Sequence, residues 1–113
     1  MACIFCSIVR GEVPATIVYQ DDLVTAFRDI NPKAPVHVLV VPNEHIPSVR
    51  DLRAEHGPLL ARMFEAASRI AAQEQVAETG FRLVMNNGPH AGQSVDHLHL
   101  HLLGGRPMAW PPG

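Results

Sequence analysis

The sequence has no long apolar run, no block of charge of one sign and few aromatic residues. No segment reaches the roughly 18 uninterrupted apolar residues of a membrane span, so no membrane partner is expected. Nine lysines and arginines stand against 11 acidic residues, which gives a formal net charge of −2. This balance argues against a surface that neutralises the many phosphates of a nucleic acid polymer. Binding of a single nucleotide remains open.

Cysteine is also scarce, since the chain has only two, spaced as Cys3-x-x-Cys6. One pair cannot form the disulfide framework of a small secreted domain. The N-terminus lacks a basic stretch followed by a secretory apolar segment, so the expected location is cytoplasmic. In a reducing compartment the cysteine pair indicates metal or redox chemistry.

The length of 113 residues suits one domain, and no repeat or low-complexity linker divides residues 1–113. Sequence patterns predict strands at residues 16–20, 24–29, 36–41, 81–86 and 95–103. Apolar residues at helical spacing, among them Met63, Phe64 and Ile70, predict a helix over residues 59–75, with Gly80 in the turn that ends it. Short turns suit antiparallel neighbours, so the expected class is α+β, a mainly antiparallel sheet packed with one long helix.

Histidine is abundant, with seven residues in the chain. Residues 97–103 read HLHLHLL, which places His97, His99 and His101 on one face of a strand and leucines on the other. Three imidazoles in this register favour metal binding, phosphate binding or nucleophilic chemistry over a merely half-exposed polar face. The alternation alone does not choose between these chemistries. His56 and His90 are expected on the surface or in loops.

The sequence around the histidines resembles the histidine-triad (HIT) family, in particular its Hint-like purine nucleoside phosphoramidases. The resemblance rests on GQSV at residues 92–95, the HLHLHLL run, the tail LGGRPMAWPPG, GEVP at 11–14, AFRDINP at 26–32 and APVH at 34–37. It implies a HIT-like fold over residues 1–113 and a two-fold homodimer. By the same resemblance the helix at 59–75 would centre the dimer interface, and the tail, residues 103–113, would reach the partner's active site.

The resemblance also implies an activity, which is hydrolysis of the P–N bond of purine nucleoside 5′-phosphoramidates derived from AMP or GMP. His99 would attack the α-phosphorus and form a nucleotidyl-histidine intermediate, which water then hydrolyses. His101 would hold a non-bridging phosphate oxygen, and Ser94 would assist the departing amine. His37 would fix the proton on its partner imidazole, and His97 would complete the triad.

A nucleotide site is implied by the same resemblance. Asp29 would accept hydrogen bonds from the ribose hydroxyls, and Asn86 would line the phosphate site. The other expected substrate-binding residues are Phe5, Ile8, Val13, Phe27 and Ile30 around the base, Gln93 and Val95 beside Ser94, and Trp110 in the tail. Alternative functions are a dinucleoside polyphosphate hydrolase, a nucleotidyltransferase, or a non-catalytic interaction module that binds nucleotide or zinc.

The cysteine pair, together with His45, resembles a zinc-binding subset of the same family. In that subset the first triad histidine, here His97, completes the tetrahedral site of Cys3, Cys6 and His45. Two thiolates and two imidazoles would form a closed structural zinc (Zn²⁺) site that pins the N-terminus to the sheet and is not required for the chemistry. The two roles compete for His97, because a ring that binds zinc cannot also donate freely to a phosphate.

Overall fold

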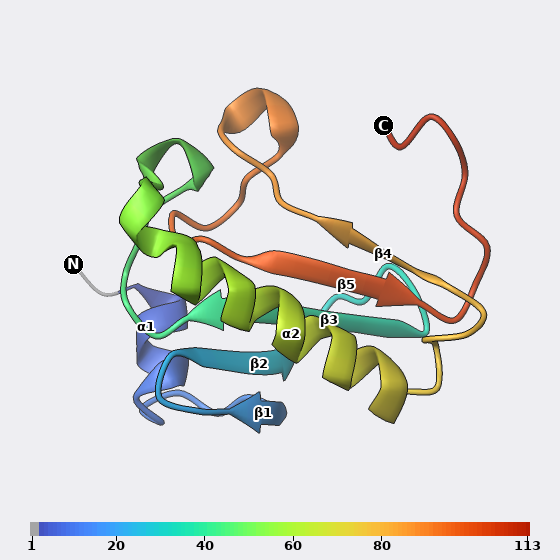
Figure 1. Cartoon of the computed structure of the whole chain (residues 1–113), viewed down its shortest axis with the longest axis horizontal. Coiled ribbons are helices and arrows are strands. Elements are labelled where there is room, and N and C mark those ends of the chain that lie inside the picture. The colour runs from blue at the N-terminus through green and yellow to red at the C-terminus, as the bar shows by residue number, and fades with distance from the viewer. Residues whose placement is uncertain (1–2) are drawn as a thin grey trace.

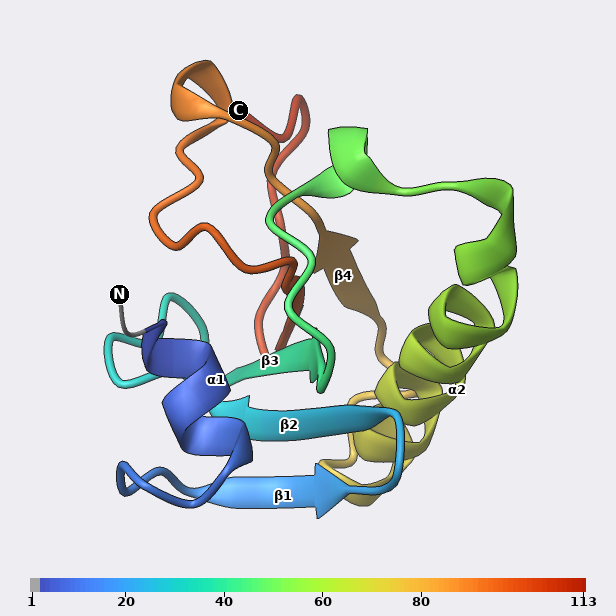
Figure 2. The same ribbon diagram turned by 90° about the vertical axis from the view of Figure 1, so that its left-hand side faces the viewer.

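The computed structural model describes residues 3–113 as an antiparallel sheet with a helix on each face (Figure 1, Figure 2). The elements are α1 (Ile4–Val9), β1 (Ile17–Gln20), β2 (Val24–Arg28), β3 (Val36–Pro42), α2 (Gly57–Gln73), β4 (Phe81–Val84) and β5 (Leu100–Gly104). Single 3-10 turns occur at Val49–Asp51, Ala54–His56 and Pro89–Ala91. The strand order is β1-β2-β3-β5-β4, with every pair antiparallel. One antiparallel sheet with one main helix confirms the expected fold class.

The long helix α2 covers one face of the sheet because its apolar residues recur at helical spacing. Its buried residues are Leu59, Met63, Ala66, Ala67, Ile70 and Ala71, which share a core with Val38 and Val40 of β3 and with Leu100 and Leu102 of β5. Phe64, expected in the same stripe, is instead 48% exposed because it lies beside this stripe rather than on it. None of the helices within residues 3–113 is long and apolar enough to cross a lipid bilayer.

The end of α2 differs from the expectation. The helix stops at Gln73, and Gln75 adopts a positive φ of 63°, the left-handed conformation that terminates a helix. Gly80, also at positive φ, belongs to the loop that leads into β4 rather than to the helix end. The amide of Glu74 still donates to the carbonyl of Ile70, so the last turn is closed before the chain reverses.

The opposite face of the sheet carries α1, a six-residue helix that the sequence patterns did not predict (Figure 2). Phe5 and Ile8 of α1 pack on Phe27, Leu39 and Val41 in a second, smaller apolar cluster. Leu39 and Val41 alternate along β3 with Val38 and Val40 of the larger core. A strand buried on both faces therefore divides the two clusters.

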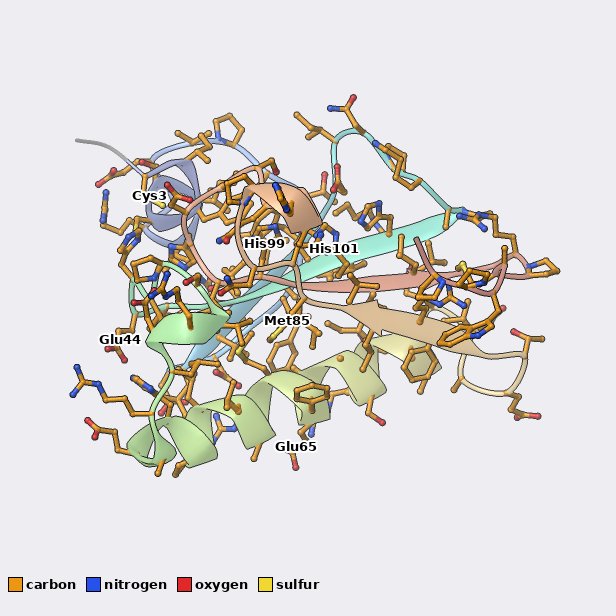
Figure 3. The ribbon with its side chains drawn as sticks, turned by 90° about the horizontal axis from the view of Figure 1, so that it is seen from above. Cys3, Glu44, Glu65, Met85, His99 and His101 are labelled. Atoms are coloured by element: carbon orange, nitrogen blue, oxygen red, sulfur yellow. The ribbon has the colours of Figure 1, made fainter. Side chains whose placement is uncertain are left out.

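The last strand is shorter than predicted, because it begins at Leu100 rather than at residue 95. Before that point the chain lies against a loop, where the amide of Leu98 donates to the carbonyl of Ile46 at 2.7 Å. The alternation nevertheless continues through this irregular segment. Leu98, Leu100 and Leu102 enter the core under α2, whereas His99 and His101 lie on the side of the sheet away from α2 (Figure 3).

Candidate active site

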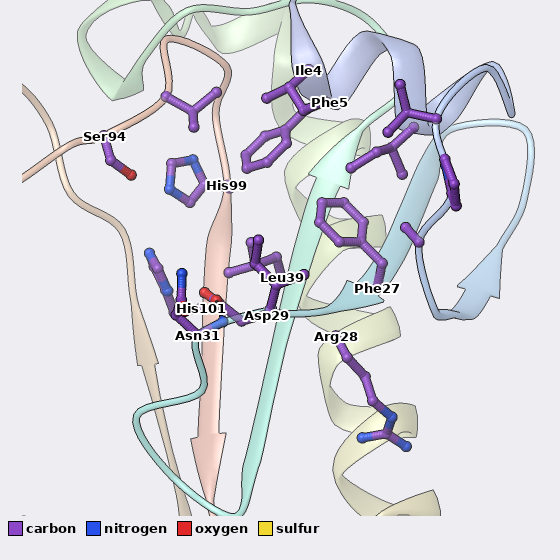
Figure 4. Close-up of a pocket in the computed structure, with 16 residues that line it drawn as sticks. Ile4, Phe5, Phe27, Arg28, Asp29, Asn31, Leu39, Ser94, His99 and His101 are labelled. Atoms are coloured by element: carbon purple, nitrogen blue, oxygen red, sulfur yellow. Dashed lines mark hydrogen bonds between the residues drawn. The ribbon is translucent and has the colours of Figure 1, made fainter.

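A cavity of about 360 Å³ lies between α1 and the face of the sheet that carries His99 and His101 (Figure 4). The predicted site residues that line it are Phe5, Ile8, Val13, Phe27, Asp29, Ile30, Ser94, Val95, His99 and His101. The rings of Phe5 and Phe27 form an apolar end, and the imidazoles, Ser94 and Asp29 supply polar groups. An apolar slot beside a few converging polar groups suits a small ligand with a ring at one end and an anion at the other.

The orientation of the His99 ring is fixed by one hydrogen bond. Its Nδ1 lies 2.7 Å from the carbonyl oxygen of His97, and a carbonyl only accepts, so Nδ1 carries the proton and donates. In the neutral ring the Nε2 lone pair is consequently free. The ring is 5% exposed and meets Phe5 edge to face, with centroids 5.2 Å apart. The hydrogen bond therefore holds the His99 ring at the cavity with Nδ1 as the donor and Nε2 unpaired among residues 3–113.

His37 and His101 form a directed chain of hydrogen bonds. The backbone amide of Lys33 donates to Nδ1 of His37 at 3.0 Å, so the proton of neutral His37 is on Nε2. That Nε2–H donates to Nδ1 of His101, 3.0 Å away. The proton of His101 is thereby placed on its own Nε2, which is buried and has no hydrogen-bond partner among residues 3–113. An unpaired buried donor is costly, which is consistent with a role in holding a ligand.

His37 and His101 both stay neutral near pH 7. Burial is the main cause that lowers the pKa of His101 to about 4, and the neighbouring His99 and His37 lower it further. Burial also lowers the pKa of His37, and this effect outweighs the opposing influence of the Asp29 carboxylate. A neutral His101 keeps a defined tautomer, so it offers one N–H to a ligand.

Asp29 lies where β2 gives way to the following loop. One carboxylate oxygen, Oδ1, accepts from the amide of Asn31 at 2.8 Å, and the other, Oδ2, lies 3.4 Å from Nε2 of His37. Asp29, His37 and His101 are close enough to hold a metal ion. The Lys33 amide on Nδ1 keeps the His37 proton on Nε2, however, and a protonated nitrogen is not a metal ligand. The geometry of Asp29, His37 and His101 thus favours a hydrogen-bonded proton on Nε2 of His37 over a bound metal ion.

A second cluster brings together the four expected metal ligands. Nδ1 of His97 lies 3.4 Å from the Cys3 sulfur, 3.5 Å from the Cys6 sulfur and 3.2 Å from Nδ1 of His45. The Cys6 sulfur is 3.4 Å from the same nitrogen of His45. Tetrahedral zinc bonds of about 2.3 Å to sulfur and about 2.0 Å to nitrogen separate S from N by roughly 3.5 Å and N from N by roughly 3.3 Å. The four residues therefore fit a zinc ion.

The ring of His97 belongs to this cluster and does not line the cavity. Its Nε2 lies 2.9 Å from the carbonyl oxygen of Pro42, so Nε2 donates and the Nδ1 lone pair faces the sulfurs. Burial lowers the pKa of His97, which keeps the ring neutral. The ring of His97 thus points toward the cysteines, and its backbone carbonyl accepts the hydrogen bond from Nδ1 of His99.

Three other expected substrate-binding residues lie outside the cavity. Asn86 lines a neighbouring space of about 420 Å³, which shares His101 with the first cavity. Gln93 braces its loop instead, because its side chain accepts from the Gly88 amide at 2.9 Å and donates to the Pro47 carbonyl at 2.8 Å. Trp110 is 81% exposed on the tail, away from the cavity within this chain.

Several residues that shape the candidate site were not predicted from the sequence. Leu39, Ile4, Pro14 and Ala15 also line the cavity. Lys33 acts through its backbone amide, which every residue except proline possesses, so no side-chain pattern marked it. Leu39 sits in a continuous apolar run, where alternation gives no clue to which face a residue takes.

Comparisons with known proteins agree with the fold of this chain. The HIT domain family matches residues 10–108. A purine nucleoside phosphoramidase of Escherichia coli (strain K12) is 59% identical over 105 residues, covering 93% of this chain and 88% of that protein. The crystal structure of a HIT family hydrolase from Legionella pneumophila Philadelphia 1 superposes with a TM-score of 0.97 and 48% identity, over 99% of this chain and 100% of that chain.

A zinc-bound relative is also similar. The crystal structure of a Zn-bound histidine triad family protein from Mycobacterium smegmatis superposes with a TM-score of 0.81 and 35% identity, covering 94% of this chain and 76% of that chain. Family match, sequence identity and superposition extend over nearly the whole chain, and the HIT match contains the three histidines of the HLHLHLL run. The chain belongs to the HIT domain family.

Proposed function

We propose that this protein hydrolyses the P–N bond of purine nucleoside 5′-phosphoramidates through a nucleotidyl intermediate on His99. The observation that carries the proposal is the Nδ1 donation from His99 to the His97 carbonyl at 2.7 Å, which leaves the Nε2 lone pair free. The 59% identity to the Escherichia coli purine nucleoside phosphoramidase supports the same substrate class.

In the first step, Nε2 of His99 attacks the α-phosphorus and the P–N bond breaks. The electron pair of that bond goes to the leaving nitrogen, which takes a proton that solvent supplies through the Ser94 hydroxyl and departs as an amine. The imidazole becomes cationic when it bonds to phosphorus. Its Nδ1–H remains bonded to the His97 carbonyl, which stabilises that charge.

In the second step, water attacks the phosphorus and the N–P bond breaks, with its electron pair returning to Nε2 of His99. The attacking water releases one proton to solvent, which balances the proton taken up in the first step, and the nucleoside monophosphate leaves. The Nε2–H of His101 donates to a non-bridging oxygen, where negative charge accumulates in both steps. His37 is a positioning residue in this scheme, because it acts only by keeping that proton on Nε2. Asp29 accepts from the ribose, and Phe5 and Phe27 contact the base.

A direct test compares two substrates with the purified protein. We expect steady-state hydrolysis of an adenosine 5′-phosphoramidate of a primary amine, with a kcat/KM well above that for diadenosine tetraphosphate. Faster cleavage of the dinucleotide would overturn the assignment in favour of a polyphosphate hydrolase. Binding of AMP without turnover of either compound would identify a non-catalytic nucleotide-binding module.

We also propose that Cys3, Cys6, His45 and His97 hold a structural zinc ion. The support is the match of their separations to a tetrahedral site and the orientation of His97 by the Pro42 carbonyl. When bound, the ion supplies a fixed link between α1, the loop at His45 and the segment before β5. No step of the proposed hydrolysis passes through it.

We further propose a two-fold homodimer with α2 at its centre and the tail of each chain near the partner's active site. Supporting observations are Phe64, 48% exposed on α2, and Trp110, 81% exposed on the tail. Such large apolar side chains favour burial against a partner. Residues 103 and 104 belong to β5, so the reaching part of the tail begins after Gly104. Sedimentation should give twice the 12.3 kDa chain mass, and a monomeric mass would contradict the dimer.

A further inference from the structure

The short helix α1 connects the metal cluster to the wall of the nucleotide cavity. Cys3 caps its N-terminus, where its sulfur accepts from the Cys6 amide at 3.5 Å. On the other side of the same helix, Phe5 and Ile8 are each only 7% exposed and line the cavity. A displacement of α1 would consequently change both sites.

Few interactions hold α1 in place. A six-residue helix has little stability of its own. Between α1 and the rest of residues 3–113, the side-chain hydrogen bonds run from Gln20 to the Val9 carbonyl at 3.2 Å and from the two sulfurs to His45 and His97. The remaining support is apolar packing around Phe5 and Ile8. The four metal ligands are thus the main polar attachment of this wall.

A second connection passes through His97. Its ring faces the cysteines, and its carbonyl oxygen accepts from Nδ1 of His99 at 2.7 Å. Phe5 contacts both rings edge to face, with centroids 5.8 Å from His97 and 5.2 Å from His99. An ion that fixes the His97 ring therefore also restrains the carbonyl and the aromatic ring that orient His99.

We propose that zinc at Cys3, Cys6, His45 and His97 is energetically coupled to nucleotide binding, and that the two cysteines are positioning residues for the nucleotide cavity. The inference rests on the zinc and nucleotide sites proposed above. Without the ion, a nucleotide must itself order α1 and its Phe5 wall, so part of its binding free energy is lost. Coupling is reciprocal, so the nucleotide raises zinc affinity by the same factor that zinc raises nucleotide affinity.

The test measures binding, independently of turnover. Titration calorimetry gives the Kd of AMP for zinc-loaded protein and for protein stripped by a chelator. Competition with a chromophoric chelator gives the Kd of Zn²⁺ with and without saturating AMP. We expect both affinities to change by one common factor, in the range of roughly 5- to 150-fold. An AMP Kd that is the same in loaded and stripped protein would overturn the coupling.

A variant of Phe5 tests the packing of α1 at the cavity without changing any metal ligand. Phe5→Ala leaves all four ligands in place, so zinc-loaded Phe5→Ala should keep one ion per chain. Because Phe5 also contacts the base in the proposed function, AMP is added at a concentration that saturates this variant, and the effect of bound AMP on zinc affinity should then be mostly lost. Val49→Ala, an exposed apolar truncation outside both sites, is the matched control and should retain the full effect of AMP on zinc affinity. If the zinc-free protein fails to fold, the comparison of the two zinc-loaded variants still tests the proposal. An equal effect of AMP on zinc affinity in Phe5→Ala and Val49→Ala would refute the role of Phe5 and α1.

The outcomes also separate the underlying proposals. Failure to take up zinc would remove the metal site and the coupling together. Zinc uptake with unchanged AMP affinity would remove the coupling alone. Zinc uptake with no AMP binding in either form would remove the nucleotide site, and the coupling with it.

Discussion

Replacement of His99 by alanine is expected to lower kcat/KM for an adenosine phosphoramidate by at least ~10³-fold while AMP binding remains measurable. The loss follows because the substitution removes the imidazole whose Nε2 is the proposed nucleophile. Binding should persist, since Asp29, Phe27 and His101 are unaltered in the cavity. Steady-state kinetics and calorimetric titration with AMP would measure the two effects.

The intermediate provides an independent readout for this variant. Mass spectrometry of rapidly quenched wild-type protein should show a nucleotidyl adduct, and His99→Ala should show none. His90→Ala is the matched control, because His90 is exposed and outside the cavity, so its turnover should equal that of the wild type. Retained turnover or a persistent adduct in His99→Ala would refute the nucleophile.

Removal of the metal is expected to lower the melting temperature by roughly 15 °C, since an ion present at about 1,000 times its Kd stabilises the folded state by about 4 kcal/mol. The stabilisation arises because the four ligands join α1, the loop at His45 and the segment before β5, parts that are far apart in sequence and unlinked in the unfolded chain. Scanning calorimetry with and without a chelator would measure the shift.

A double variant shows whether this shift comes from the proposed site. Cys3→Ser with Cys6→Ser removes both thiolates, so its melting temperature should be low and insensitive to the chelator. Elemental analysis should find about one zinc per wild-type chain and none in the variant. A wild-type melting temperature that does not respond to chelation would count against a structural ion.

The sequence predicted the class of fold and, through local pattern, which side chains share a face of the sheet. Alternation along HLHLHLL placed Leu98, Leu100 and Leu102 in one core and His99 and His101 on the opposite face, because side chains of an extended chain point alternately to either side. The spacing of apolar residues predicted α2 to within two residues at each end. Patterns predicted no helix at α1, since a helix this short has too few turns for a periodic signal.

Sequence by itself determined which chemical groups the protein possesses: three alternating imidazoles, a cysteine pair and a carboxylate after a strand. Tertiary structure decided which nitrogen each imidazole exposes, because that depends on carbonyls and amides brought from elsewhere in the chain. The Pro42 carbonyl turns the ring of His97 toward the cysteines, and the Lys33 amide sets the proton of His37 and, through it, that of His101. Backbone groups are the same in every residue but proline, so only the folded chain shows which of them reach a histidine.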